Sequence, residues 1–169
     1  MAGTMSTSRI VAAAMWVVFC ATASAQSPSA VQRLEDRASI ERLLIEYGRT
    51  LDARDFKAYS ELFAKDGVWS GGMGTVQSPG AIKTFMEKAI PGPNTAHNFH
   101  ILSSFAIDVN GDTATAWSRW TFMVPGPNNT AVAAQSGRYD DALVREDGRW
   151  KFKKRVASND IPAGGPAQK

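Results

Sequence analysis

The spacing of apolar residues changes from a helical to a strand-like period near the middle of the chain. Across residues 31–53, apolar side chains recur at helical intervals, while Arg37, Glu41 and Glu46 fill the opposite side. The apolar positions of this segment are Ile40, Leu43, Leu44, Tyr47 and Leu51. The pattern predicts a long amphipathic helix at the start of the folded part of the chain.

Two shorter helices are predicted after the first. Asp55 is a favourable N-terminal cap for one of them, which should end at residues 64–67. Ser78 followed by Pro79 is typical of the start of the other. Their apolar faces contain Phe56, Tyr59, Leu62 and Phe63 in the one and Ile82, Phe85, Met86 and Ile90 in the other. Between them, Val68-Trp69 is predicted to begin a short strand.

The second half of the chain consists of extended segments joined by tight turns. An Asn110-Gly111 pair lies in the middle of two extended segments that together cover residues 95–124. The pair favours a two-residue type I′ hairpin turn, because both turn positions need positive φ. A strand over residues 130–145, a second turn at Asp147-Gly148 and a last strand over residues 150–161 follow. This order predicts an α+β fold: a curved antiparallel sheet with three helices on one face, enclosing a pocket.

The two ends of the chain have features that set them apart from this single domain. Arg9, an apolar run over residues 10–21 and the Ala23-Ser24-Ala25 site predict a signal peptide, residues 1–25, that is removed. We expect residues 26–33 to form a leader, residues 34–161 the domain and residues 162–169 a disordered tail. The apolar run is too short for a stable membrane anchor. The prediction is therefore export to a periplasm or the medium, with a bacterial source favoured because the only cysteine, Cys20, lies within the signal peptide.

Charge and histidine spacing argue against nucleic acid and metal. The formal net charge is only +3, and the basic positions after Trp150 alternate with aromatic residues, as on the solvated face of a strand. His97 and His100 stand at odd strand spacing with no evident third ligand. We expect neither a nucleic-acid partner nor a metal, and no cofactor.

Four stretches of the chain resemble the NTF2-like superfamily, in its SnoaL-like branch. They are I-E-R-L-L-I-E-Y-G-R-T-L-D (residues 40–52), A-Y-S-E-L-F-A-K-D-G-V-W (58–69), H-I-L-S-S-F-A-I-D-V-N-G-D-T-A-T-A (100–116) and R-E-D-G-R-W-K-F-K-K-R (145–155). The resemblance implies a cone-shaped α+β barrel. In layout the chain looks closest to the small cofactor-free lyases of this family: scytalone dehydratase, bile acid 7α-dehydratase and hexachlorocyclohexane dehydrochlorinase.

This resemblance implies four catalytic residues, namely Tyr47, Asp52, His100 and Arg155. His100 would be the base, Asp52 would hold its imidazole in one tautomer, Tyr47 would donate a hydrogen bond, and Arg155 would stabilise negative charge. The sequence departs from many relatives by having Ser104 four residues after the histidine, and by the additional His97. A second catalytic aspartate of the ketosteroid isomerase kind has no matching position.

Strand and helix geometry limit these assignments. On a regular strand His97 faces away from His100, and Arg155 faces away from Trp150 and Phe152 unless a bulge intervenes. Asp52 lies about 140° around an ideal helix from Tyr47, so a pocket reaches both only at the helix end. Each residue also has an ordinary structural explanation, such as a half-buried strand histidine or a core tyrosine.

Further polar and apolar residues complete the predicted binding site. The expected substrate-binding residues are His97, Arg119, Trp69, Phe85, Trp120 and Met123. Together the features predict a dehydratase-type lyase acting on a hydrophobic cyclic or polycyclic small molecule through a His-Asp dyad. The alternatives are a non-catalytic small-molecule-binding or dimerisation module, or an isomerase or hydrolase on the same scaffold. A homodimer or higher homo-oligomer is expected.

Overall fold

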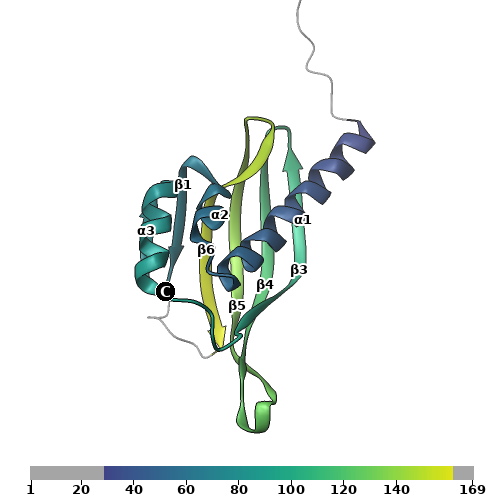
Figure 1. The fold of residues 1–169 in the computed structure, drawn as a ribbon. Helices are drawn as coiled ribbons and strands as arrows, with labels where there is room; N and C mark the ends of the chain where they lie inside the picture. Colours follow the sequence, from purple (N-terminus) through teal and green to yellow (C-terminus); the bar gives the residue numbers. More distant parts are fainter. Residues whose placement is uncertain (1–28, 162–169) are drawn as a thin grey trace, which may run out of the picture.

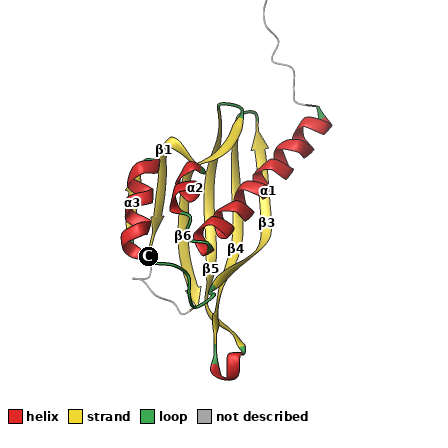
Figure 2. Ribbon diagram, in the orientation of Figure 1, coloured by secondary structure: helices red, strands yellow, loops and turns green. Residues whose placement is uncertain are grey.

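Three α-helices pack against a six-stranded sheet in the computed structural model, which describes residues 29–161 (Figures 1 and 2). The helices are α1 (Ala30–Asp52), α2 (Phe56–Glu61) and α3 (Pro79–Ala89), with a short 3-10 turn, η1 (Pro127–Asn129). The strands are β1 (Phe63–Gly71), β2 (Gly74–Gln77), β3 (Phe99–Asn110), β4 (Thr113–Pro125), β5 (Ala131–Glu146) and β6 (Arg149–Ile161). The predicted signal peptide and tail lie outside the described residues. The predicted leader, residues 26–33, overlaps the start of α1.

The three predicted helices are present and begin at polar caps. The side chains of Ser29, Asp55 and Ser78 each accept a hydrogen bond from a backbone N–H in the first turn of their helix. Figure 1 shows α1 running diagonally across one face of the sheet, with α2 and α3 lying towards β1. No helix within residues 29–161 has the length and apolar character needed to cross a membrane.

The second helix is shorter than predicted, and the first strand begins earlier. Phe63 already belongs to β1 and pairs with Phe152 of β6, and the Leu62 carbonyl accepts a hydrogen bond from the Phe152 N–H at 2.9 Å. Phe63 is fully buried there. A partner about 90 residues away in sequence thus ends the helix, and no local periodicity encodes that pairing.

The sheet is open and mixed, whereas a purely antiparallel sheet was expected. Its strand order is β2-β1-β6-β5-β4-β3, so β2 and β3 are free edges. All neighbouring strands are antiparallel except β1 and β6, which are parallel. The α+β class and the curved sheet agree with the prediction, whereas the pocket between sheet and helices is partly open rather than enclosed.

Both predicted hairpins form, one of them displaced by a residue. Asn110 pairs with Thr113, so the two turn residues are Gly111 and Asp112 rather than Asn110 and Gly111, and only Gly111 has positive φ. At the second hairpin Asp147 and Gly148 both have positive φ, as a type I′ turn requires.

A bulge in β6 sets the direction of its side chains. Leu143 pairs with Phe152, and the preceding residue of β5, Ala142, pairs with Lys154, so Lys153 is the extra residue. Phe152 and Arg155 are buried while Lys153 and Lys154 are exposed. The bulge therefore turns Arg155 to the core side of the sheet.

The core between α1 and the sheet is largely aromatic around Tyr47. The rings of Tyr59, Phe63, Tyr139 and Phe152 lie with their centroids 4.8, 6.5, 5.3 and 5.6 Å from that of Tyr47. These tilted and edge-on contacts fix the Tyr47 ring in one place. One side of this cluster borders the cavity described next.

Candidate active site

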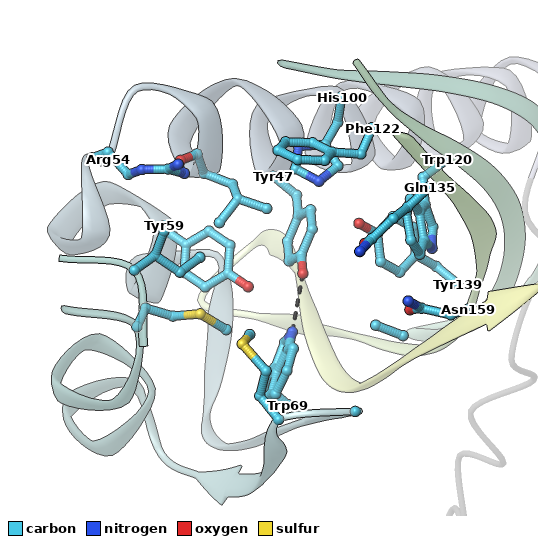
Figure 3. Close-up of a pocket in the computed structure, with 16 residues that line it drawn as sticks. Tyr47, Arg54, Tyr59, Trp69, His100, Trp120, Phe122, Gln135, Tyr139 and Asn159 are labelled. Carbon is cyan, nitrogen blue, oxygen red and sulfur yellow. Dashed lines mark hydrogen bonds between the residues drawn. The ribbon is translucent and has the colours of Figure 1, made fainter. Parts of the chain in front are cut away.

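A cavity of about 400 Å³ lies between the helices and the sheet, where strands β1, β3, β4, β5 and β6 contribute to its lining (Figure 3). Its apolar wall is formed by Leu51, Trp69, Gly72, Met73, Met86, Ile90, Trp120, Phe122 and Ala157. Its polar groups come from Tyr47, Arg54, Tyr59, His100, Gln135, Tyr139 and Asn159. An apolar, aromatic wall with a few polar groups is typical of a pocket for a small organic molecule.

His100 and Asp52 form a close pair at the wall of this cavity. The His100 Nδ1 lies 2.6 Å from Asp52 Oδ1, and the backbone N–H of His100 donates to Asp52 Oδ2 at 2.8 Å. The two side chains are 14% and 19% exposed. One carboxylate thus binds both the ring and the backbone of His100. With Nδ1 held by Asp52, Nε2 is the ring nitrogen left for a ligand.

The end of α1 and the loop before β3 are tied together so that this pair can form. The Asn94 Nδ2 donates to the Asp52 carbonyl at 3.0 Å and to the Asn98 carbonyl at 2.6 Å. The Asn94 Oδ1 accepts a hydrogen bond from the Asn98 N–H at 3.1 Å. Asp52 is the last residue of α1, which lets its carboxylate reach β3 although Tyr47 faces elsewhere on the helix. The angular difficulty foreseen from the sequence is resolved at the helix end.

Tyr47 is nearly buried and shares a hydrogen bond with Trp69. The Trp69 Nε1–H donates to the Tyr47 hydroxyl oxygen at 3.0 Å, and Tyr47 is only 2% exposed (Figure 3). Because Trp69 acts as the donor, the hydroxyl proton of Tyr47 stays free to be donated to a ligand.

Arg155 lies behind the cavity wall and does not line the cavity. Its guanidinium makes two hydrogen bonds of 2.7 Å to Asp141, and both side chains are 0% exposed. The guanidinium carbon is 3.9, 4.1 and 4.2 Å from the ring centroids of Tyr47, Tyr139 and Phe152. Burial opposes its charge, but the Asp141 carboxylate outweighs burial and raises the pKa of Arg155 above its ordinary value. A direct contact between Arg155 and a ligand, as the resemblance implied, does not fit this position.

Two further tyrosines of the wall were not predicted as site residues. Burial is the main reason that the pKa values of Tyr59 and Tyr139 are raised well above the usual value, so both remain neutral donors. The Tyr59 hydroxyl is buried without a hydrogen-bond partner among the described residues. Tyr139 shares the buried face of β5 with Asp141 and Leu143, a period-two pattern visible in the sequence, whereas Tyr59 looked like an ordinary core residue of a helical stripe.

The expected substrate-binding residues divide between the cavity and other places. Trp69 and Trp120 line the cavity. Phe85 lies behind Trp69, with 5.5 Å between the ring centroids. Met123 follows the cavity residue Phe122 along β4 and does not line the cavity, because neighbouring side chains of a strand face opposite sides.

His97 and Arg119 are away from the cavity. His97 is exposed in the loop before β3, with a φ of 53°, where a strand was expected. The Asn94 hydrogen bonds close that loop and delay the strand to Phe99. Arg119 donates to Asp160 at 3.2 Å and lies over the Trp117 ring. Among the described residues, no three His, Cys, Asp or Glu side chains gather as metal ligands would.

Comparisons with known proteins agree with this fold. Residues 32–156 match the SnoaL-like domain family, so the chain belongs to that family. An uncharacterized protein of Mycobacterium tuberculosis is 28% identical over 136 residues, which cover 78% of this chain and 90% of the relative.

Solved structures from Novosphingobium aromaticivorans are similar in fold. One is an NTF2-like protein with a cystatin-like fold, 25% identical, with a TM-score of 0.69 and coverage of 81% of this chain and 88% of the other. Another is a protein proposed to be an aromatic ring hydroxylase, 27% identical, with a TM-score of 0.65 and coverage of 79% and 94%. The NTF2-like fold predicted from the sequence is thereby confirmed.

Proposed function

We propose that this protein is a cofactor-independent lyase that eliminates water from a hydrophobic, ring-containing small molecule. The observation that carries the proposal is the His100–Asp52 pair at the wall of an apolar cavity. A base held in one tautomer by a carboxylate, next to a space of ligand size, suits abstraction of a proton from carbon.

In the proposed first step, His100 Nε2 takes a proton from a carbon next to a substrate carbonyl. Asp52 accepts the Nδ1–H throughout, so the positive charge that develops on the imidazole lies beside a carboxylate. The apolar wall lowers the local dielectric constant and strengthens this interaction. The electron pair of the broken C–H bond forms the C=C bond of an enolate, and the π pair of the carbonyl moves onto its oxygen.

In the second step the enolate oxygen re-forms the carbonyl, the enolate C=C pair becomes the double bond to the β-carbon, and the C–O bond of the hydroxyl on that carbon breaks. The imidazolium returns its proton to the departing oxygen, so that water leaves and His100 is neutral again. Tyr47 donates its hydroxyl proton in a hydrogen bond to the substrate carbonyl, where negative charge grows as the C–H bond breaks. The proton that His100 removes from carbon leaves with the water, so no further proton donor or acceptor is required.

The role of Arg155 in this mechanism is indirect. Its charge lies 3.9 Å from the Tyr47 ring centroid, outside the lining of the cavity, and it is balanced by Asp141. It positions the ring and favours negative charge near the tyrosine hydroxyl without touching substrate.

The residues that line the cavity favour a substrate that contains rings. Trp69, Trp120 and Phe122 present aromatic faces to the cavity, and its volume of about 400 Å³ suits a molecule of a few fused rings. A fold relative is proposed to act as an aromatic ring hydroxylase. We further propose export, from the features of residues 1–25, and assembly into a homodimer, which native mass spectrometry of the purified protein would test.

The test of the proposed base compares the two histidines. A His100→Ala variant, assayed against a panel of hydroxylated cyclic ketones, should lose about 100-fold or more of any turnover found with the wild-type protein. His97→Ala is the matched control, because His97 is exposed and outside the cavity, and it should keep full activity. Turnover within threefold of wild type in His100→Ala would show that His100 is not the base.

A second measurement tests the pairing itself. The ¹⁵N shifts of the His100 ring should report a single tautomer protonated at Nδ1, and Asp52→Asn should change them while leaving those of His97 unchanged. If the His100 signals do not respond to Asp52→Asn, the dyad is absent in solution. The cavity would then serve ligand binding without this chemistry.

A further inference from the structure

Arg54 places an unneutralised cation on the helix side of the cavity. It follows α1 directly and lines the cavity, and Figure 3 shows it on the same wall as Tyr59. Its Nη1 donates to the Leu51 carbonyl at 2.9 Å. Four of the five guanidinium N–H groups remain for other partners.

The backbone at Arg54 has a conformation that usually calls for glycine. The Arg54 N–H donates to the Leu51 carbonyl and the Asp55 N–H donates to the Thr50 carbonyl, which is the Schellman pattern at a helix end. Arg54 occupies the left-handed position of that motif, with a φ of 59°. Because glycine is favoured there, an arginine carries a backbone cost that its hydrogen bond to the Leu51 carbonyl offsets in part.

Arg54 also differs from most arginines of the described chain in having no carboxylate partner there. Arg37, Arg49 and Arg145 are examples that pair with Glu41, Glu46 and Asp36, respectively. The nearest acidic residues in sequence are engaged elsewhere: both carboxylate oxygens of Asp52 contact His100, and Asp55 caps α2.

We propose that Arg54 binds an anionic group of the ligand, most simply a carboxylate attached to its ring system. The inference deepens the proposed function, because it names the substrate class of the same cavity. The guanidinium holds the anion on the helix side, and the buried Tyr59 hydroxyl, which has no partner within the described chain, donates to a second oxygen. The ring then lies against Trp120 and Phe122, within reach of His100.

Two fluorescent probes that differ mainly in charge test this proposal. One is 8-anilinonaphthalene-1-sulfonate, which joins a naphthalene to an anion, and the other is N-phenyl-1-naphthylamine, its neutral counterpart. Arg54→Gln should weaken binding of the sulfonate about tenfold or more and leave binding of the neutral probe within twofold. Arg49→Gln, which removes an exposed arginine outside the cavity, is the control and should change neither affinity.

Arg54→Gly separates binding from folding. Because glycine suits the left-handed position, this variant should melt at or above the wild-type temperature and still lose affinity for the sulfonate. Asp147→Gly, at an exposed position with a φ of 51°, is the matched backbone control and should keep both affinities.

Equal sulfonate affinities in wild type and both Arg54 variants would overturn the proposal, as would a wild-type protein that does not bind the sulfonate. Either result leaves the assignment of His100 intact, because His100→Ala is judged by turnover and not by probe charge. Conversely, a turnover that survives in His100→Ala would remove the proposed lyase and leave the Arg54 anion site standing.

Discussion

The surroundings of Arg155 combine two opposing effects on a buried charge. Removing a guanidinium from water costs several kcal/mol, and the two hydrogen bonds to Asp141 with the three neighbouring aromatic rings offset that cost. One nitrogen, Nη1, is buried without a partner within the described residues. The Arg155–Asp141 pair therefore contributes more to the orientation of the Tyr47 and Tyr139 rings than to the free energy of unfolding.

This view predicts an asymmetry between single and double substitutions. Arg155→Met leaves the Asp141 carboxylate buried without a counter-charge and should lower the free energy of unfolding by about 3–5 kcal/mol. The double variant Arg155→Met/Asp141→Leu should recover most of that loss. Urea unfolding followed by tryptophan fluorescence measures both values.

The exposed pair Arg119–Asp160 provides the control for this comparison. Arg119 is 49% exposed, so Arg119→Met should change the free energy of unfolding by no more than about 1 kcal/mol. A single Arg155 variant as stable as this control would show that the buried pair is not an energetic unit.

The site residues differ in how far the sequence could reveal them. Tyr47, Asp52 and His100 stand at positions that the family resemblance singles out, and the structure brings Asp52 and His100 into contact. Arg54 carries no such signal, because a left-handed helix end is usually recognised by a glycine. Arg155 was also singled out by the resemblance, but its place behind the wall depends on the bulge at Lys153.

At the scale of elements, the contact between β5 and its neighbours depends on one glycine. Gly137 pairs with Trp120 of β4 and with Asn159 of β6, beside a register shift in which Asp160 of β6 is the extra residue. A Cβ at this position would stand 1.9 Å from the Ser158 carbonyl oxygen and 2.6 Å from the Trp120 ring. Neither contact is possible without moving the strands or a cavity residue.

Gly137→Ala should therefore damage both stability and the cavity. The expected loss is about 1–3 kcal/mol in the free energy of unfolding, with weaker binding of the neutral naphthylamine probe because Trp120 is displaced. Gly80→Ala in α3 is the opposite control: nothing lies within 4 Å of its Cβ, and alanine should stabilise the helix. Thermal melting of the two variants should shift in opposite directions, and equal shifts would contradict the argument.

The predicted elements succeeded where short-range chemistry determines them. Asp55 and Ser78 cap α2 and α3 as predicted, Ser29 caps α1 without having been singled out, and Asp147-Gly148 formed its turn as expected. The start of β1 failed because its partner is Phe152, far along the chain, and the loop at His97 failed because Asn94 bonds across it. Errors thus fall where a hydrogen bond, from a distant strand at Phe152 or from the nearby Asn94 side chain, overrides the pattern of apolar residues.

For the whole molecule, α1 is held on the sheet by a polar contact as well as by its apolar face. Asp36 is only 4% exposed, and its Oδ1 accepts from Arg145 at 2.6 Å, from Gln32 at 3.1 Å and from Trp150 at 3.3 Å. Arg145 also donates to Asp112 at 2.9 Å. The beginning of the long helix is thereby joined to both strands of the β5–β6 hairpin.

This contact predicts how stability depends on pH. Burial alone would raise the pKa of Asp36, but the hydrogen bonds from Arg145, Gln32 and Trp150 outweigh it and the pKa is lowered. The unfolded chain then binds the proton more tightly than the folded one, so the stabilisation is complete above the ordinary value of 3.8 and is lost as the pH falls through the lower folded value. The free energy of unfolding should decline below about pH 4 and, for this group, stay level above about pH 5.

Asp36→Asn should flatten that decline while costing about 1–3 kcal/mol near neutral pH, since a neutral amide bonds Arg145 less strongly. Asp112→Asn, at a side chain that is 80% exposed, should change the free energy of unfolding by less than about 1 kcal/mol at neutral pH. Urea unfolding at a series of pH values from 2.5 to about 7 measures the slopes. If Asp36→Asn keeps the full acid slope of the wild-type protein, other carboxylates control acid unfolding and the contact of α1 with the β5–β6 hairpin contributes little to it.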